Sequence, residues 1–283
     1  MSQRQANPEQ ATYWNEIGGP RWVAMQEDLD AELAPFGVAV ETALALRAGA
    51  HVLDVGCGAG ATSLSLTERV RPGEVLGVDI SAPLLARARQ RAQGVAGLRF
   101  QLADAQTFAF EPERFDAVFS RFGVMFFADP VAAFSNLRVA LRTTGKLGFV
   151  CWRSQDENPS FTLPARAAMP FLQERPESPK PGEPGPFAFA QREHLANVLE
   201  RAGFCDVSIE PQDTHMVFAG RRDLEGAVEQ AFEFGPLGRL RTPLEPHVRA
   251  QVWDAIRAAF EPHYGPSGVV LPAATWLVTA RKG

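Results

Sequence analysis

Three aspartates, Asp54, Asp79 and Asp104, each belong to a short apolar run in the first part of the chain. Asp54 interrupts the apolar segment "VLDV", Asp79 comes near the end of "EVLGVDI", and Asp104 lies in "LADAQ". If these runs are adjacent parallel strands, their carboxyl ends meet at the edge of the sheet where ligands bind. Carboxylates at that edge could accept hydrogen bonds from a ligand's hydroxyl or amine groups, or attract a positive charge.

Three alternating glycines, Gly56, Gly58 and Gly60, follow Asp54 directly and precede an expected helix. Residues without a Cβ let a ligand approach the backbone closely, and three of them exceed what a tight turn needs. The run "GCGAGA" fits G-x-G-x-x-A, a permitted form of the dinucleotide fingerprint. A nicotinamide dinucleotide is therefore one candidate ligand.

The charge of Asp54 separates this candidate from another. A pyrophosphate is anionic and would be repelled by Asp54, whereas a ligand with an ammonium and a sulfonium group would be attracted. Asp79 suits the ribose hydroxyls of either ligand, and Asp104 suits the exocyclic amine of adenine. The three acids predict S-adenosylmethionine (SAM), with an NAD(P)-dependent oxidoreductase or a non-catalytic SAM-binding protein as alternatives.

Short apolar runs alternate with amphipathic helical patterns through much of the chain. This alternation is typical of a parallel sheet covered by helices on both faces. The expected fold class is α/β, with a doubly wound, mostly parallel sheet. Strands are expected at 51–57, 74–80, 99–105, 115–122, 146–152, 205–211 and 274–282, and helices at 60–70, 83–93, 130–142 and 191–202, with further helical patterns at 13–46 and about 221–260.

Four motifs in order, "VLDVGCGAG", "GVDIS", "LADAQ" and "FDAVFSRF", carry a resemblance to a known family. Residues 50–153 resemble the class I SAM-dependent methyltransferases, and within them the quinone-biosynthesis type and related small-molecule methyltransferases. The resemblance implies a Rossmann-like sheet of seven strands, with "WLVTARK" in the antiparallel seventh strand, and an α-helical cap. It also implies SAM as cofactor, S-adenosylhomocysteine as product, and in-line transfer of a methyl group to a small-molecule acceptor.

The resemblance also assigns a cofactor site residue by residue. Asp79 would chelate both ribose hydroxyls, Asp104 would accept from the adenine amine, and Asp54 would help to hold the amino group through water. Arg121 would face the methionine portion, although an interdomain ion pair is an equal alternative, and Asp104 could instead cap a helix. The full set is Asp54, Gly56, Cys57, Gly58, Gly60, Asp79, Ile80, Asp104, Ala105, Ser120 and Arg121, with Trp14 and Trp22 closing over the methionine tail.

Aromatic residues outside the glycine loop are candidates for the acceptor site. The run "RFGVMFF" (121–127) follows the fourth strand, and the segment 154–190 carries further phenylalanines. An apolar wall suits a reaction in which positive charge disperses, but the same side chains could simply form core. The candidate acceptor residues are Phe122, Phe126, Phe161, Phe187, Phe189 and His215, and neither a catalytic base nor a metal ligand is named.

The chain divides into a core and segments that could cover it. Eight of its 22 prolines fall within 154–190, a density that argues against regular structure there. Insertions after parallel strands emerge at the strands' carboxyl ends, so these segments are expected to select the acceptor. The expected pieces are a helical cap segment at 1–47, a SAM-binding core at 48–153, a proline-rich lid at 154–190, a core helix and strand at 191–213, a helical cap insertion at 214–270 and the terminal strand at 271–283.

Composition narrows the function classes further. The 283 residues carry a net charge of −5 without a Lys/Arg block, which disfavours nucleic-acid partners, and "SRFG" lacks the Asn/Asp-Pro-Pro-aromatic motif of base methylators. Three cysteines without paired spacing predict neither disulfides nor a zinc site. The start has no apolar leader and no run reaches membrane-spanning length, so a cytoplasmic location is expected. A small-molecule acceptor is the expected partner, and the oligomeric state stays open, with a homodimer as one option.

Overall fold

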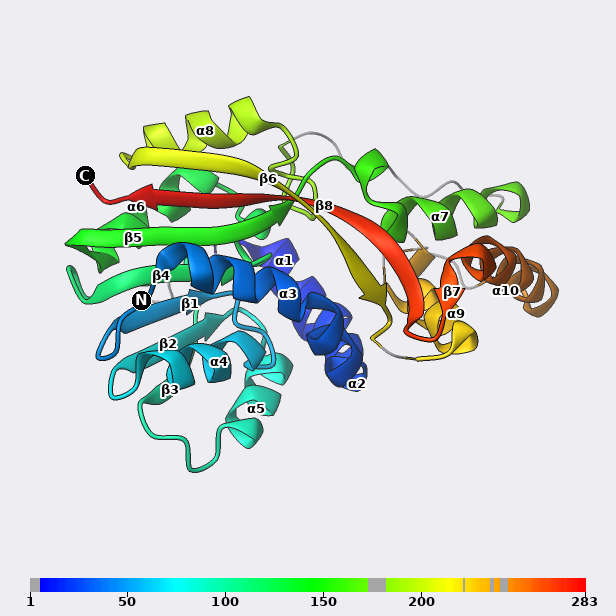
Figure 1. The fold of residues 1–283 in the computed structure, drawn as a ribbon, viewed down its shortest axis with the longest axis horizontal. Helices are drawn as coiled ribbons and strands as arrows, with labels where there is room; N and C mark the ends of the chain where they lie inside the picture. Colours follow the sequence, from blue (N-terminus) through cyan, green and yellow to red (C-terminus); the bar gives the residue numbers. More distant parts are fainter. Residues whose placement is uncertain (1–5, 173–181, 221, 235–236, 240–243) are drawn as a thin grey trace.

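The computed structural model describes residues 6–172, 182–220, 222–234, 237–239 and 244–283. Its centre is a sheet in which seven strands lie in the order β3-β2-β1-β4-β5-β8-β6 (Figure 1). A two-residue strand, β7 (Tyr264–Gly265), pairs with β8 outside this order. The seven are β1 His51–Val55, β2 Glu74–Asp79, β3 Leu98–Leu102, β4 Phe115–Arg121, β5 Leu141–Trp152, β6 Cys205–Phe218 and β8 Gly268–Arg281.

The expected doubly wound sheet is confirmed. Strands β1 to β5 are parallel, and β8 runs antiparallel between β5 and β6. The strand order reverses between β1 and β4, so a crevice lies at the carboxyl ends of these two strands. Asp54 on β1 pairs in register with Gly77 on one side and Phe119 on the other, which places its carboxylate in the middle of the sheet.

Helices cover both faces of the sheet (Figure 1). Phe119, Phe134 and Phe149 are fully buried and form the core where β4 and β5 meet the helix between them. The helices α3 Gln26–Leu44, α4 Ala61–Val70 and α5 Ala82–Arg91 pack on one face, α6 Pro130–Ala140 and α8 Arg192–Arg201 on the other, and α1 Pro8–Glu16 and α2 Gly18–Ala24 precede α3.

The last two long strands extend well beyond the sheet and correct the expected bounds. β6 and β8 each contain 14 residues, and they stay paired from Gln212 opposite Thr275 to Phe218 opposite Val269. The expectation ended the first of these strands at Pro211 and began the second at Ala274, but both strands continue through a proline, which is tolerated where a strand lacks a second neighbour. The outer region is therefore a two-stranded ribbon joined by α9 (Leu224–Glu233) and α10 (Pro246–Phe260), and is only partly helical (Figure 1).

The proline-rich segment also differs from expectation, because α7 (Pro159–Ala168) lies inside it. Pro159 occupies the first turn of the helix, where a missing N–H costs no hydrogen bond. Pro164 lies within the helix and is buried, so packing outweighs the loss of one main-chain donor. The prediction of irregular structure is wrong for this stretch, whereas Pro176, Pro179 and Pro181 lie outside the described residues.

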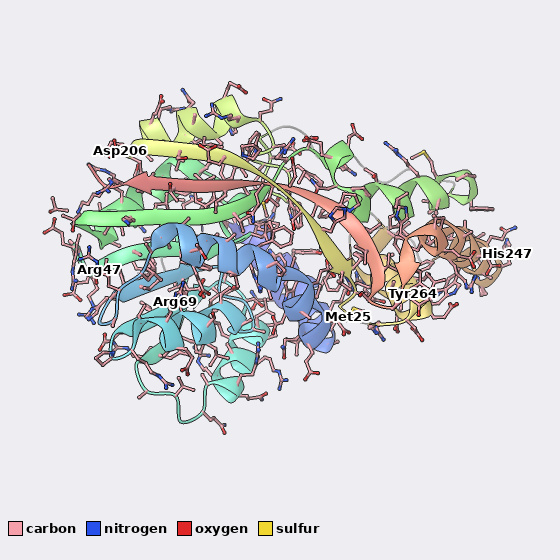
Figure 2. All side chains as sticks on the ribbon, viewed as in Figure 1. Met25, Arg47, Arg69, Asp206, His247 and Tyr264 are labelled. Carbon is pink, nitrogen blue, oxygen red and sulfur yellow. The ribbon has the colours of Figure 1, made fainter. Side chains whose placement is uncertain are left out.

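Charged and polar side chains point outward at both ends of the molecule. Figure 2 shows Arg47, Arg69 and Asp206 toward the end away from α7 and α10, with His247 and Tyr264 at the opposite end. All five residues are exposed. In the described ranges, no helix is both long enough and apolar enough to cross a membrane.

Candidate functional site

A cavity of about 1010 Å³ lies at the carboxyl ends of β1, β2 and β4 and continues beneath α7, β6 and α9. We call its two parts the core half and the cap half. The core half contains the glycine loop, Asp79, Ile80, Asp104, Ala105 and Arg121, and the cap half contains Glu32, Trp152, Phe161, Phe187, Phe218 and Gln230.

The three glycines of the loop all have positive φ, at 69°, 54° and 85°, and Gly56 and Gly58 line the cavity whereas Gly60 does not. A Cβ on Gly56 would lie 2.6 Å from the Gly123 backbone, and one on Gly60 would lie 3.0 Å from the Ala88 Cβ. A Cβ on Gly58 would meet nothing within 4 Å. Gly56 and Gly60 are thus required by packing inside the protein, whereas Gly58 presents bare backbone to the cavity.

Asp54 is fully buried behind this loop and does not itself line the cavity. Its Oδ2 accepts hydrogen bonds from Thr62 Oγ1 at 2.7 Å and Ser63 Oγ at 2.6 Å. Its Oδ1 finds no partner in the described part of the chain. Burial raises the pKa of Asp54 to about 6, against the two hydroxyl donors and the charge of Arg121, which lower it.

Asp79 lines the cavity and holds the glycine loop. Its Oδ2 accepts from the Gly58 N–H at 2.8 Å, and its Oδ1 accepts from the Ser81 N–H at 2.8 Å. Burial raises the pKa of Asp79, and these main-chain donors oppose that effect. Because each carboxylate oxygen has a second lone pair, both oxygens can still accept hydrogen bonds from a ligand.

Asp104 closes a turn and keeps one oxygen available. Its Oδ1 accepts from the Gln106 N–H at 2.9 Å, an arrangement two residues apart that makes an Asx turn. No helix begins here, so the helix-cap alternative does not apply. Asp104 Oδ2 has no hydrogen-bond partner within the described ranges, and Ala105 beside it also lines the cavity.

Arg121 combines the two roles that its sequence position left open. It lines the cavity, and its Nη2 lies 3.8 Å from Asp30 Oδ1 on α3. Arg91 of α5 also pairs with Asp30, at 2.9 Å, so this acid ties α3 to the core beneath the cavity. Asp30 lines the cavity as well and was not predicted, because nothing in its local sequence distinguishes it from an ordinary helix surface residue.

Aromatic side chains form most of the remaining wall. Trp14 packs edge-to-face against Trp22 and Phe126, with ring centroids 6.1 Å and 5.4 Å away. Phe122 stacks on Trp152 at 4.3 Å and 9°. The predicted site residues Trp14, Trp22, Phe122, Phe126, Phe161 and Phe187 all line the cavity, and Trp152 is an additional ring that was not predicted.

Besides Asp54, four predicted site residues do not line the cavity. Gly60 packs inside the protein, and the Ser120 hydroxyl donates to the Val55 carbonyl at 2.7 Å, which ties β4 to the strand before the glycine loop. Phe189 is 1% exposed and packs against Phe134 in the core behind the sheet. His215 is exposed on β6, because its neighbours Met216 and Phe218 occupy the cavity face and strand side chains alternate.

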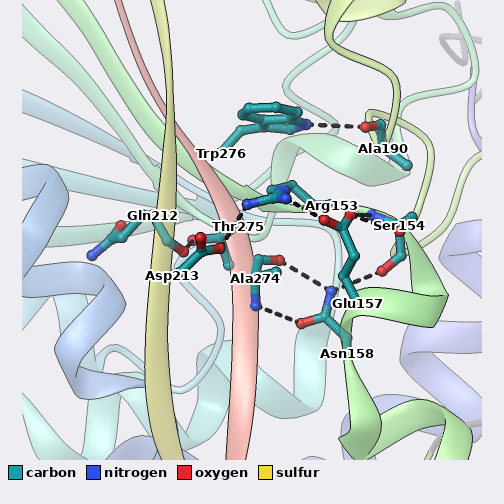
Figure 3. Close-up of polar contacts among 10 residues, drawn as sticks. All are labelled: Arg153, Ser154, Glu157, Asn158, Ala190, Gln212, Asp213, Ala274, Thr275 and Trp276. Carbon is teal, nitrogen blue, oxygen red and sulfur yellow. Dashed lines mark hydrogen bonds and ion pairs between the residues drawn. The ribbon is translucent and has the colours of Figure 1, made fainter.

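A buried asparagine fixes the start of α7 (Figure 3). The Asn158 side chain accepts from the Ala274 N–H at 2.9 Å and donates to the Ala274 carbonyl at 3.0 Å, like an extra residue paired to β8. Ser154 and Glu157 form a capping box just before it. This anchor holds the helix that brings Phe161 into the cavity wall.

Two further polar residues, Glu32 of α3 and Gln230 of α9, meet in the cap half. Glu32 Oε2 accepts from Gln230 Nε2 at 2.7 Å and from the Ala219 N–H at 2.9 Å. Burial raises the pKa of Glu32 to about 7, although these two donors lower it. No sequence signal marked this pair, since the two residues are 198 positions apart.

Comparison with known proteins agrees with this geometry. Residues 52–145 match the methyltransferase domain family. The chain is 38% identical over 134 residues to the demethylmenaquinone methyltransferase of Thermus thermophilus, which covers 44% of this chain and 60% of that protein. It is 36% identical over 122 residues to the uncharacterized protein Rv1405c of Mycobacterium tuberculosis, covering 42% and 43%. The chain therefore spans less than two thirds of either relative.

Over residues 52–145 the chain is therefore similar to a SAM-dependent methyltransferase domain. Its fold is shared with Haemonchus contortus phosphoethanolamine N-methyltransferase 2 in complex with S-adenosylhomocysteine, at a TM-score of 0.52 and 19% identity, over 87% of this chain and 52% of that one. At that identity the likeness concerns the fold alone.

The core half fits the cofactor of this methyltransferase family, SAM. Asp54 Oδ1 and Asp104 Oδ2 are acceptors left without donors by the described residues. Gly58 offers bare backbone, and Asp79 keeps free lone pairs next to Ile80. Donors on the ligand would satisfy Asp79 and Asp104 directly and Asp54 Oδ1 through water, so a ligand with amine and ribose hydroxyl groups matches what this half of the cavity presents.

Proposed function

We propose that the protein transfers the methyl group of SAM to a small-molecule acceptor held in the cap half of the cavity. The observation that carries this proposal is the continuity of one cavity from Gly58 and Asp79 to the aromatic wall formed by Phe161 and Phe187. Such a cavity brings the methyl donor and an acceptor together in one water-poor space, which an in-line displacement requires.

In this proposal the core half holds SAM through its free acceptors. Asp79 binds the two ribose hydroxyls, Asp104 accepts from the adenine amine through Oδ2, and Ile80 packs against the adenine. Asp54 acts through water on the amino group, since its carboxylate is buried behind the loop. Arg121 lies beside the methionine portion, where its pairing with Asp30 fixes its position.

SAM supplies an activated methyl carbon, so the protein mainly orients and shields. Phe122 and Trp152, stacked beside Gly123 at the end of β4, form an apolar surface that suits dispersal of the sulfonium charge. Trp14 and Phe126 cover the opposite side and exclude water. No histidine lines the cavity in the described residues, so positioning carries most of the catalysis in this proposal.

The nature of the acceptor is supported by the relatives as well as by the wall. Relatives of the matching region include demethylmenaquinone methyltransferases, whose name denotes a quinone-type acceptor. The ring of Phe161 packs edge-to-face against Trp152 at 5.5 Å and against Phe187 at 4.9 Å, a wall that suits a flat, apolar molecule. We therefore extend the proposal to a ring-bearing acceptor.

Ligand-dependent stability tests the cofactor directly. SAM and S-adenosylhomocysteine should each raise the melting temperature, and at 100 times its dissociation constant a ligand adds about 2.7 kcal/mol. NAD and NADP should give no shift, because Asp54 disfavours a pyrophosphate beside the loop. A shift with NADH and none with SAM would overturn the proposal in favour of an oxidoreductase.

A further inference from the structure

The Glu32–Gln230 pair is the polar feature of an otherwise mostly apolar cap half. Gln230 is 1% exposed and Glu32 is 6% exposed, and both line the cavity. Trp22, Phe218 and Phe234 line the same region. A carboxyl and an amide so placed are costly to bury, which makes their hydrogen-bond partners informative.

The pair is incompletely satisfied. Gln230 donates through Nε2 to Glu32, but its Oε1 has no hydrogen-bond partner among the residues described. A buried acceptor without a donor is destabilising, because the hydrogen bond it would make to water is lost on burial. Ser160 Oγ, across the cavity on α7, is a second buried polar atom in this wall for which the described residues supply no partner.

The charge around Glu32 also points to a missing donor. The charged group that affects it most is Asp28, another acid, so its surroundings disfavour a second negative charge. Glu32 does anchor the Ala219 N–H at the end of β6, but a neutral amide at this position would accept the same hydrogen bonds. The anchoring role therefore does not explain why the site has both an acid and an unpaired amide oxygen.

We infer that Gln230 and Glu32 bind the polar end of the methyl acceptor, and that this acceptor carries a hydrogen-bond donor, a hydroxyl or an amine, on an apolar, ring-bearing body. This inference rests on the proposed function, since it concerns the second substrate of the same cavity. The hydroxyl or amine of the methyl acceptor gives Gln230 Oε1 its missing hydrogen bond and also reaches the Glu32 carboxyl. The rings of Trp22 and Phe234, 5.9 Å apart, pack against the body.

Three matched probes test this inference: 4-propylphenol, 4-propylbenzylamine and 4-propylanisole, which has a similar shape but no donor. Calorimetry with the protein saturated by S-adenosylhomocysteine should show a donor-bearing probe binding about tenfold more tightly than the anisole. If the phenol and the amine both bind more tightly than the anisole, the contact is a neutral hydrogen bond. If only the amine binds more tightly, the contact is with charged Glu32.

The variant Gln230→Leu should bring the ratio of donor to anisole affinity close to one. Gln212→Leu is the matched control, because Gln212 Oε1 is also buried and has no partner among the described residues, but the residue lies outside the cavity wall. Should Gln230→Leu fail to fold, Glu32→Gln keeps both hydrogen bonds of the wild-type acid and should still alter the amine affinity.

Equal affinities for all three probes in the wild type would overturn the inference, as would a ratio unchanged in Gln230→Leu or a lack of binding by every probe. The S-adenosylhomocysteine titration that precedes each measurement separates the two proposals. If that titration shows binding, a negative probe result concerns the acceptor alone. If it shows none, the proposed function itself fails.

Discussion

The two halves of the cavity are held together by different forces. In the core half, main-chain groups and carboxylates from a single stretch of chain bind one another, as when Asp79 accepts from the N–H groups of Gly58 and Ser81. In the cap half, rings from α2, β5, α7 and β6, with that of Phe234 just after α9, meet across long sequence separations, with Glu32 and Gln230 as a polar contact among them.

This difference indicates how each half responds to change. Main-chain hydrogen bonds at the end of a sheet have fixed directions, so the core half should tolerate little alteration of backbone shape. Packed rings have no fixed partners and can rearrange, so the cap half should tolerate substitutions of similar volume. Each prediction below alters one half and asks whether the other responds.

The largest expected effect is steric and belongs to the glycine loop. Gly56→Ala and Gly58→Ala both place a side chain at positive φ, which costs about 1 kcal/mol. Only Gly56→Ala adds a contact of 2.6 Å with the backbone of Gly123. Chemical denaturation should show a loss of about 3 kcal/mol or more for Gly56→Ala and about 1 kcal/mol for Gly58→Ala.

The affinity for S-adenosylhomocysteine should rank these two variants in the opposite order from their stability. Gly58→Ala should remain folded yet bind S-adenosylhomocysteine more weakly, since its methyl enters the cavity. Equal stability of the two variants would contradict the assignment of Gly56 to internal packing.

The next effect concerns Glu32 and depends on pH. Its pKa is raised from 4.5 to about 7 in the folded protein. The stability linked to this proton is fully present below pH 4.5 and is lost as the pH rises through 7. Glu32→Gln removes this titration, so the free energy of unfolding of the wild type should fall relative to the variant by about 3 kcal/mol at high pH.

Urea denaturation of both proteins from pH 5 to pH 9 measures this difference. Asp54, whose pKa is also raised, is common to the two proteins and cancels. A difference that stays constant across the range would show that Glu32 does not titrate there, and that the cap half is more polar than its burial indicates.

Asp79→Ala should have a moderate effect confined to the core half. It removes both ribose acceptors and the anchor of the Gly58 N–H. Losing hydrogen bonds to a charged group should weaken SAM binding by about 2 kcal/mol, roughly 30-fold. Calorimetry on the folded variant provides the measurement, with Asp116→Ala, an acid on β4 beside the first residue of β1 and away from the cavity, as control. Unchanged SAM affinity would reject the role of Asp79.

The difference between the core half and the cap half also determines which site residues could be predicted from the sequence. The core half was predictable because Asp54, Asp79 and the glycines belong to local motifs whose places follow from strand order. Asp30, Glu32 and Gln230 were not, because each is an ordinary polar residue on a helix until the fold brings it to the cavity. The division of the chain into core and cap segments stays a prediction.

Two errors came from proline. Helix α7 starts at Pro159, where proline is favoured, and the ribbon of β6 and β8 continues past Pro211 and Pro272. The density of prolines argued against regular structure at 154–190, but it says little about a first helical turn, and the short expected strands did not allow for an outer strand that tolerates proline. The misplacement of Phe189 has a different origin. Its proximity to Phe187 in sequence does not reveal that the two rings point to different regions.

The smallest effects should separate Phe187 from Phe189, two residues apart. Phe187 lines the cavity and contacts Phe161 at 4.9 Å, whereas Phe189 is buried against Phe134 behind the sheet. Phe187→Leu should leave SAM affinity and melting temperature nearly unchanged and should alter affinity for a ring-bearing acceptor. Phe189→Leu should lower the free energy of unfolding by about 1 kcal/mol with no effect on acceptor binding.

Paired measurements on these two variants test whether the cap half acts as an acceptor site. Thermal denaturation gives the stability of each variant, and titration with 4-propylphenol in the presence of S-adenosylhomocysteine gives acceptor binding. Because both substitutions replace phenylalanine by leucine, the changes in side-chain volume and hydropathy are the same in the two variants. Only the position of the substitution differs. If Phe187→Leu instead lowered stability and spared the probe, its ring would serve packing alone, and the acceptor would have to bind nearer to Phe122 and Trp152.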